Sequence, residues 1–362
     1  MFLYKIFVSV YARKFIATIV VFDGNNAKFK LLQFKESREV KIEKCPICES
    51  VDAAVETDEQ MVYRCPECLH LFYIPSEQEK DSSSFLHFDL LEEIGQGSNA
   101  IVYKAWNKQD ERYCALKLFL CSDYADGESD FEKEYEFAAS LIHPNIIQVY
   151  TGGHGGRAEF LESELFESID LNDYLEKYGK MPIEDAIAVG SEVCKALDYV
   201  WSNYLAIHRD IKPHNMLLNN DGEIKICDFG MVNEHGEWFD DMKIEGTPFY
   251  LSPESISGDY QDNRSDIYAL GVTLFHLIAG EPPFDDPSLK KTIYARLESS
   301  LPDIRMFDIS VPQSVAFVLQ TMMATDPDDR YVTANECLDD LLRLLNGDAP
   351  DLVDSRRPKI NH

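Results

Sequence analysis

The stretch that decides the fold reads His208-Arg209-Asp210-Ile211-Lys212-Pro213-His214-Asn215, followed thirteen residues after Asn215 by Asp228-Phe229-Gly230. Both motifs are polar and lie in a region of otherwise strand-like and helix-like apolar patterns. Other members of the series follow downstream in order: Gly246-Thr247-Pro248, Ser252-Pro253-Glu254, Asp266 at the start of an apolar helix, and Arg330. The two central motifs are highly specific together, and the chance that the whole series arises by structural coincidence is well under ~1%.

A glycine-bearing turn lies upstream, between two predicted strands, and reads Gly95-Gln96-Gly97-Ser98-Asn99-Ala100-Ile101-Val102. Glycines allow the backbone to approach a triphosphate closely. The turn alone is weak evidence, because any strand-turn-strand can carry two glycines and the third position here is Ala100. It gains weight from Lys117, which lies in the apolar strand Ala115-Leu116-Lys117 and needs an anionic partner, and from Glu134 on a predicted helix.

In this order and spacing the series resembles the eukaryotic-type protein kinase family over about residues 86–346. The resemblance implies an α+β, bilobal fold with a β-rich N-lobe and a helical C-lobe. It also implies ATP- and Mg²⁺-dependent transfer of a γ-phosphate to Ser or Thr of protein substrates. Lysine at position 212 and threonine at position 247 resemble the Ser/Thr class and not the tyrosine class.

The resemblance also assigns roles in transfer. Asp210 would orient the substrate hydroxyl and accept its proton, and Lys212 would neutralise the γ-phosphate. Glu254 and Arg330 would form a structural pair in the C-lobe. Asp266 is interpreted as a residue that braces the catalytic loop and not as a catalyst.

The resemblance assigns the nucleotide site to the glycine-rich turn, the third strand, the hinge and the two central motifs. Lys117 would grip the α and β phosphates and be held by Glu134, while Asn215 and Asp228 would hold Mg²⁺, since carboxylate and amide oxygens suit a hard cation. The expected nucleotide-binding residues are Gly95, Gly97, Ser98, Val102, Ala115, Lys117, Glu164, Leu165, Asp170, Asn215 and Asp228.

Residues 160–165 are expected to form the last strand of the N-lobe and the hinge. Asp170 matches a position that contacts ribose or a substrate arginine, but as a helix-start carboxylate it could equally be an N-cap.

Four of the nine cysteines form the pairs Cys45-Pro46-Ile47-Cys48 and Cys65-Pro66-Glu67-Cys68, separated by 16 residues. This spacing predicts a structural zinc ribbon with all four thiolates, Cys45, Cys48, Cys65 and Cys68, as ligands. Two redox pairs and a four-thiolate iron centre are the alternatives. Four protein ligands would leave no open position, so the metal would support folding and not catalysis.

The chain is thus expected to comprise a β-hairpin-like segment (1–39), the zinc-ribbon-like module (40–75), a polar linker (76–85), the kinase domain (86–346) and a polar tail (347–362). Charges cut the N-terminal apolar runs well below the roughly 18 residues of a spanning helix, so we expect no membrane segment. The remaining cysteines are scattered, which favours a reducing, cytoplasmic location.

Charge limits the class of partner. The formal net charge is −30, but residues 1–44 carry nine Lys/Arg against four Asp/Glu, which leaves −35 on the rest. An acidic body argues against nucleic-acid binding. The resemblance implies a protein substrate, and we expect a protein partner of the ribbon. A nucleic-acid-binding ribbon and a pseudokinase scaffold are the alternatives.

The predicted activation segment is unusual, because residues 231–246 contain no Ser, Thr or Tyr. Many kinases of this family are activated when a phosphorylated residue in this segment pairs with the arginine before the catalytic Asp. We hypothesise that Asp240 or Asp241 pairs with Arg209 instead. The alternative is that these acids only keep the segment soluble.

Overall fold

The computed structural model describes residues 4–11, 14–23, 26–33, 39–40, 54–56, 62–64, 71–73, 87–96, 100–119, 130–155, 158–229, 248–284, 296–297 and 301–351. Side chains are described for 87–96, 100–119, 135–153, 159–229, 249–284, 296–297 and 301–351. The chain divides into two units, one comprising 1–86 with 154–158 and the other comprising 87–153 with 159–362.

The first unit contains two antiparallel sheets. Strands β1 (Tyr4–Tyr11), β2 (Lys14–Asp23) and β3 (Asn26–Gln33) form a meander, with Asp23 opposite Asn26 across the β2–β3 turn. This is one strand more than the expected hairpin. The second sheet has the order β4 (Glu39–Val40), β5 (Ala54–Glu56), β6 (Val62–Arg64) and β7 (Leu71–Tyr73). The four paired cysteines lie outside the described residues.

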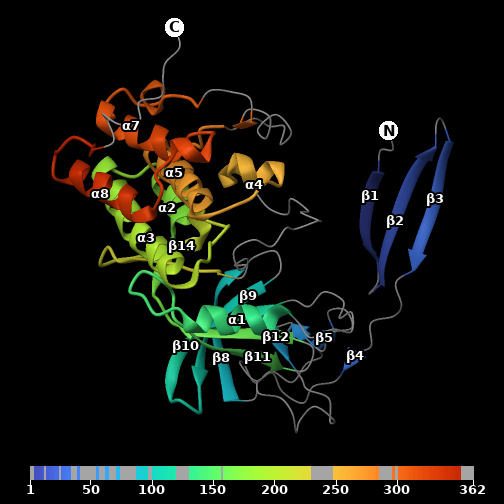
Figure 1. Cartoon of the computed structure of the whole chain (residues 1–362). Coiled ribbons are helices and arrows are strands. Elements are labelled where there is room, and N and C mark those ends of the chain that lie inside the picture. The colour runs from blue at the N-terminus through green and yellow to red at the C-terminus, as the bar shows by residue number, and fades with distance from the viewer. Residues whose placement is uncertain are drawn as a thin grey trace. The chain divides into compact units, whose positions relative to one another are not determined.

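The second unit begins with a five-stranded sheet in the order β11-β12-β10-β9-β8, accompanied by helix α1 (Figure 1). The elements are β8 (Phe88–Gln96), β9 (Ala100–Asn107), β10 (Arg112–Phe119), α1 (Asp130–Ser140), β11 (Val149–Gly155) and β12 (Ala158–Glu164). Ile101, Tyr103 and Ala105 are buried at alternate positions of β9, as the two-residue repeat of a strand requires. This alternation fixes which face of the sheet meets the core.

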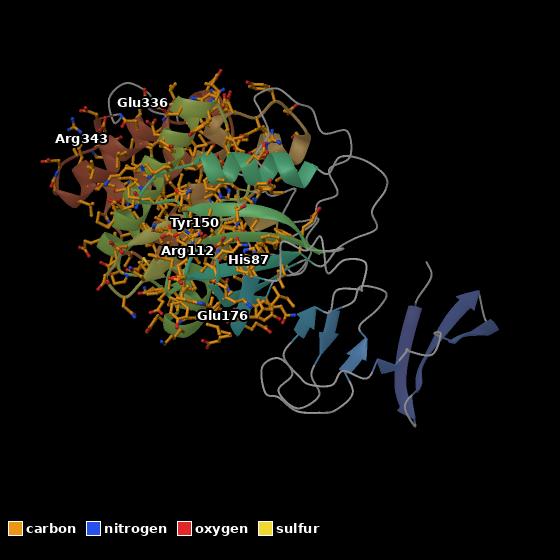
Figure 2. The ribbon with its side chains drawn as sticks, turned by 90° about the horizontal axis from the view of Figure 1, so that it is seen from below. His87, Arg112, Tyr150, Glu176, Glu336 and Arg343 are labelled. Carbon is orange, nitrogen blue, oxygen red and sulfur yellow. The ribbon has the colours of Figure 1, made fainter. Side chains whose placement is uncertain are left out.

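A cluster of polar side chains connects strands β9, β10, β11 and β12 of this sheet. The guanidinium of Arg112 lies 3.7 Å from the ring centroid of Tyr150, and Figure 2 shows the two side chains next to each other. Arg112 also donates through Nη2 to Oε1 of buried Glu162 at 2.9 Å. Asn107 donates to the same oxygen at 2.9 Å. The buried carboxylate is therefore paired, as burial of a charge requires.

The rest of the second unit is mainly helical (Figure 1). Its elements are β13 (Ser168–Asp170), α2 (Leu171–Tyr178), α3 (Ile183–Tyr204), η2 (Pro213–Asn215), β14 (Met216–Asn219), β15 (Ile224–Ile226), η3 (Pro248–Tyr250), α4 (Pro253–Ser257), α5 (Asn263–Ala279), η4 (Ile304–Met306), α7 (Gln313–Met322), η5 (Pro327–Asp329) and α8 (Ala334–Leu345). Strands β13, β14 and β15 form a small antiparallel sheet. A sheet-rich lobe and a helical lobe agree with the expected bilobal fold.

Helix α5 is the centre of the helical lobe. Almost all of its side chains are buried, because the helix is apolar on every face and is surrounded by α3, α7 and α8. At Gly271 a Cβ atom would lie 2.8 Å from Cβ of Met322, so only glycine allows α5 and α7 to approach this closely. In the part of the chain that the structure describes, none of the helices has the length and apolar character needed to cross a membrane.

Candidate active site

The catalytic-loop residues converge on one carboxylate. Oδ2 of Asp210 accepts from Nδ2 of Asn215 at 2.8 Å and from Nζ of Lys212 at 2.8 Å. Nδ2 of Asn215 also donates to the backbone oxygen of Asp210 at 2.8 Å. The structure therefore brings together three of the residues that the sequence singled out, and their contacts use Oδ2 and the backbone oxygen of Asp210.

Asp266, near the start of α5, holds the backbone of this loop. Its two carboxylate oxygens accept from the backbone N–H groups of His208 at 2.6 Å and Arg209 at 2.8 Å. Arg209 has a φ of 67°, in the left-handed region that a side chain of this size rarely adopts. Burial raises the pKa of Asp266, while the His208 and Arg209 contacts oppose the rise. Asp266 thus braces the loop, as the sequence suggested.

Replacing Asp266 by asparagine tests this brace. The asparagine side chain would retain only one acceptor oxygen, so one buried N–H would lose its partner. We expect Asp266→Asn to lower the free energy of unfolding by about 1–3 kcal/mol. Asp303→Asn is the matched control, because Asp303 caps η4 through the backbone N–H of Arg305 and asparagine caps equally well. Urea denaturation of both variants measures the difference, and an equal loss in the two would contradict the brace.

His208 connects the catalytic loop to the Asp228 motif. Its Nε2 lies 3.0 Å from the backbone oxygen of Cys227, and its ring lies 4.5 Å from the ring of buried Phe229. The backbone N–H of Cys227 donates to the backbone oxygen of Asn215 at 3.0 Å. These contacts hold Asp228 beside the loop, in a left-handed backbone conformation with a φ of 65°. Arg209 and Asp228 thus both have a positive φ, and such sparsely populated backbone conformations cluster at functional sites.

Lys117 pairs with Asp228. Its Nζ lies 2.5 Å from Oδ1 of Asp228, across 111 residues of sequence. Loss of hydration by itself raises the pKa of Asp228, but the charge and hydrogen bond of Lys117 hold it below its ordinary value. The expected partner Glu134 lies on α1, at a position whose side chain is outside the described part. The anionic partner that an apolar strand lysine requires is therefore Asp228 in this structure.

The donor set suits a hard cation. Nδ2 of Asn215 is used for Asp210, so Oδ1 is the side-chain atom of Asn215 left for a metal ion. Asp228 is ionised at neutral pH, because its pKa is lowered. One carboxylate and one amide oxygen, with further positions left to phosphates and water, fit Mg²⁺.

The predicted nucleotide-binding residues fall on adjoining strands. Gly95 of β8 lies opposite Val102 of β9, and Val102 lies opposite Lys117 of β10. Ala115 lies opposite Ser163 at the end of β12, which the hinge follows. Gly97 and Ser98 lie outside the described residues. Gly95, Val102 and Lys117 therefore form one row across the sheet, and Ala115 lies two residues from Lys117 along β10, towards the predicted hinge.

Glu164, in the predicted hinge, has two hydrogen-bond partners among the described residues. The carboxylate of Glu164 accepts from Nζ of Lys225 at 2.6 Å and from the backbone N–H of Gln148 at 2.8 Å. Leu165 follows it and is half-buried. The sequence carried no signal for the Glu164–Lys225 pair, which joins β12 to β15. It links the hinge to the helical lobe.

Asp170 is the N-cap of α2. Its Oδ1 accepts from the backbone N–H groups of Asn172 and Asp173, both at 2.8 Å. Of the two interpretations left open by the sequence, the structure shows the helix cap. A role in contacting ribose or a substrate arginine stays a prediction.

Glu254 and Arg330 form a buried, two-point ion pair. Nη1 and Nη2 of Arg330 donate to the two oxygens of Glu254 at 2.7 and 2.8 Å. The hydroxyl of Ser265 donates to Glu254 at 2.6 Å. Arg330 donates further to the backbone oxygens of Ala324 and Arg264 at 2.7 and 3.0 Å. The pair ties α4 to the segment before α8 and to α5, which is the structural role expected from the sequence.

The fold and site together define a class: a two-lobed phosphoryl-transfer domain. The family model of the protein kinase domain matches residues 88–342. The chain belongs to this family.

Among curated proteins, the chain is similar to several bacterial serine/threonine-protein kinases. PrkC of Bacillus subtilis is 33% identical over 266 residues, which are 72% of this chain and 41% of that protein. PknB of Mycolicibacterium smegmatis is 33% identical over 287 residues, 75% of this chain and 45% of the relative. PknB of Mycobacterium tuberculosis is 32% identical over 289 residues, 75% and 46% of the two chains. This chain thus matches less than half the length of these relatives.

Proposed function

We propose that this chain is a protein serine/threonine kinase that transfers the γ-phosphate of ATP, with Mg²⁺, to hydroxyl groups of protein substrates. The observation that carries the proposal is the cluster of Asp210, Lys212 and Asn215 beside the Lys117–Asp228 pair. Phosphoryl transfer requires mainly positioning and charge compensation, and this cluster supplies both. The kinase names of its relatives support the same reaction.

The residues divide the work. Asp210 accepts the proton of the substrate hydroxyl at Oδ1, while Lys212 and Asn215 fix the orientation of its carboxylate through Oδ2. Lys212 then compensates the charge that develops on the transferred group, and Lys117 grips the nucleotide phosphates. Asn215 and Asp228 would hold Mg²⁺, which neutralises phosphate charge when bound.

A pseudokinase scaffold is the alternative. It is disfavoured because every charged residue that the reaction needs is present in the sequence, including Glu134. Among the described residues, Asp210, Lys212, Asn215, Lys117 and Asp228 also lie in one site.

Transfer of ³²P from labelled ATP to a mixed protein substrate tests the proposal, with Lys117→Ala as the matched variant. We expect label in phosphoserine or phosphothreonine after acid hydrolysis, and none above background with Lys117→Ala. Label in phosphotyrosine would contradict the Ser/Thr assignment. No transfer by the wild-type chain, with ATP still bound, would support the scaffold.

We propose a structural zinc ion for Cys45, Cys48, Cys65 and Cys68, which lie outside the described residues. The proposal rests on two Cys-x-x-Cys pairs at ribbon spacing. We expect elemental analysis of protein purified under reducing conditions to give one zinc per chain, and Cys45→Ser to release it. Cys114→Ser is the control, because Cys114 is a buried thiol of β10 and should leave the zinc content unchanged. Iron in place of zinc, or no stoichiometric metal, would contradict the zinc ribbon.

We also propose which partners the chain binds and where in the cell it acts. A protein partner would bind the ribbon, the acidic body disfavours nucleic acid, and the scattered cysteines favour the cytoplasm. The hypothesis that Asp240 or Asp241 replaces a phosphorylated residue concerns positions outside the described residues. It stays a prediction, tested by activity after phosphatase treatment.

A further inference from the structure

A groove of about 900 Å³ lies beside the predicted hinge. Asp210, Lys212, Asn215, Lys117 and Asp228 do not line it, whereas Glu164, one of the predicted nucleotide-binding residues, does. We call it the hinge groove. Its walls come from the hinge, α2, α3, the β14–β15 hairpin and the end of α8; α3, α8 and β14 lie close together in Figure 1. Among the residues that line it are Asp185, Leu218, Glu223, Lys225, Leu342 and Leu345.

One wall of the hinge groove is apolar and exposed. Leu342 and Leu345 lie three positions apart on α8, so they share one face, and they are 40% and 39% exposed. They stand outside the core of the helical lobe, whereas Leu341 on the same helix is 1% exposed and belongs to it. Half-buried Tyr174 and Leu218 line the same hollow. A single exposed leucine is ordinary, but a hollow lined by several apolar side chains marks a binding surface.

The rim of the hinge groove is acidic. Four carboxylates and one ammonium group line it. Glu164 is neutralised by Lys225 at 2.6 Å, and Glu192 by Lys195 at 2.5 Å. Asp185 and Glu223 form no salt bridge with any cation among the described residues. Two carboxylates are thus available to an incoming positive charge.

These observations select the occupant. An apolar wall accepts aliphatic side chains. Asp185 and Glu223 carry negative charge without a salt bridge among the described residues, although Glu223 accepts a hydrogen bond from Nδ2 of Asn219 at 2.8 Å. Such carboxylates attract a cation and repel phosphorylated peptides, nucleic acids and anionic membranes. We infer that the hinge groove docks a peptide segment of a partner protein in which basic residues lie next to leucine-like residues. This site is separate from the phosphoryl-transfer site and goes beyond the proposed function.

The test uses the full chain and fluorescence anisotropy. The probe is a short fluorescein-labelled peptide with two arginines followed by two leucines and without Ser, Thr or Tyr. We expect saturable binding that the variant Asp185→Lys/Glu223→Lys weakens about tenfold or more, since opposite charges become like charges. Leu342→Ser/Leu345→Ser should also weaken it about tenfold or more, because the peptide would cover less apolar surface.

The matched control is Glu184→Lys/Asp221→Lys. It makes the same change of net charge on the same two elements, at exposed residues that do not line the groove. At physiological salt, screening should keep its effect within about twofold. Equal weakening by the two charge variants would overturn the inference, as would a failure of the peptide to bind.

Another occupant would also be detected. The segment after α8 carries Arg356, Arg357 and Lys359. If Arg356→Ser/Arg357→Ser/Lys359→Ser in the full chain tightened peptide binding about tenfold, the chain's own segment would be the occupant and the partner inference would fail. The binding measurement needs neither ATP nor transfer, so its failure leaves the proposed kinase activity untouched, and a catalytically inactive chain would still bind the peptide.

Discussion

Asp210→Asn is expected to lower kcat roughly 10²–10⁴-fold while ATP binding stays close to wild type. Asparagine has nearly the same shape and retains an oxygen for Lys212 or Asn215, but it cannot accept the hydroxyl proton. The measurement is steady-state transfer from labelled ATP to a protein substrate, with nucleotide affinity determined separately by calorimetry in the presence of Mg²⁺.

Asp228→Asn is the matched variant, because it also removes one carboxylate charge but at the proposed metal position. It should abolish transfer by a different route, with Mg²⁺ no longer strengthening nucleotide binding. It also removes the 2.5 Å ion pair with Lys117. Transfer at wild-type rates in either variant, or identical effects of both variants on Mg²⁺-dependent binding, would contradict these role assignments.

Arg330→Met is expected to destabilise the fold by about 3–5 kcal/mol, the largest stability effect that the described residues suggest. Methionine keeps much of the side-chain volume but leaves Glu254 as a buried charge without its cation. The Glu254 side chain is 7% exposed and that of Arg330 is fully buried, so water cannot replace the lost hydrogen bonds. Thermal or urea unfolding of the full chain measures the loss.

The pH dependence of this loss follows from the pKa of Glu254. Burial by itself raises that pKa, but the hydrogen bonds and charge of Arg330 hold it below its ordinary value. The pair's contribution is therefore fully present above the ordinary glutamate pKa, and it fades as the pH falls through the lowered value. In the variant, only the Ser265 hydroxyl and a backbone hydrogen bond still oppose the effect of burial, so the pKa of Glu254 is higher than in the wild type and the carboxylate takes up a proton more readily. The stability difference between wild type and variant should thus shrink from pH 7 towards pH 4.

Arg343→Met is the control for this prediction. Arg343 pairs with Asp351 at 2.6 Å, but the two side chains are 40% and 76% exposed. Exposed pairs contribute about 0–1 kcal/mol, so this variant should remain close to wild type. A loss in Arg330→Met no larger than that in Arg343→Met would show that the buried pair is not important for stability.

Helix periodicity allowed much of the helical lobe to be predicted. Apolar residues recur at helical spacing over residues 182–201, 265–279 and 333–345, which predicts three helices. The structure has them at Ile183–Tyr204, Asn263–Ala279 and Ala334–Leu345. The spacing of apolar residues predicts these helices well because each of them buries one face, or nearly all of its surface, in the core of the helical lobe. The first segment was less predictable, and it has three strands where a hairpin was expected.

The sequence by itself determined the identity and order of the predicted catalytic residues. Residues 208–215 and 228–230 are near each other in the chain, and phosphoryl transfer requires those residue types at that spacing. Only the tertiary structure decided which partners the charged residues take. Lys117 meets Asp228 across 111 residues, Lys225 meets Glu164 across 61, and Asp170 caps α2. Such partners depend on how strands and helices pack, since Coulomb attraction and hydrogen bonding act over a few ångströms in space and leave no periodic mark along the chain.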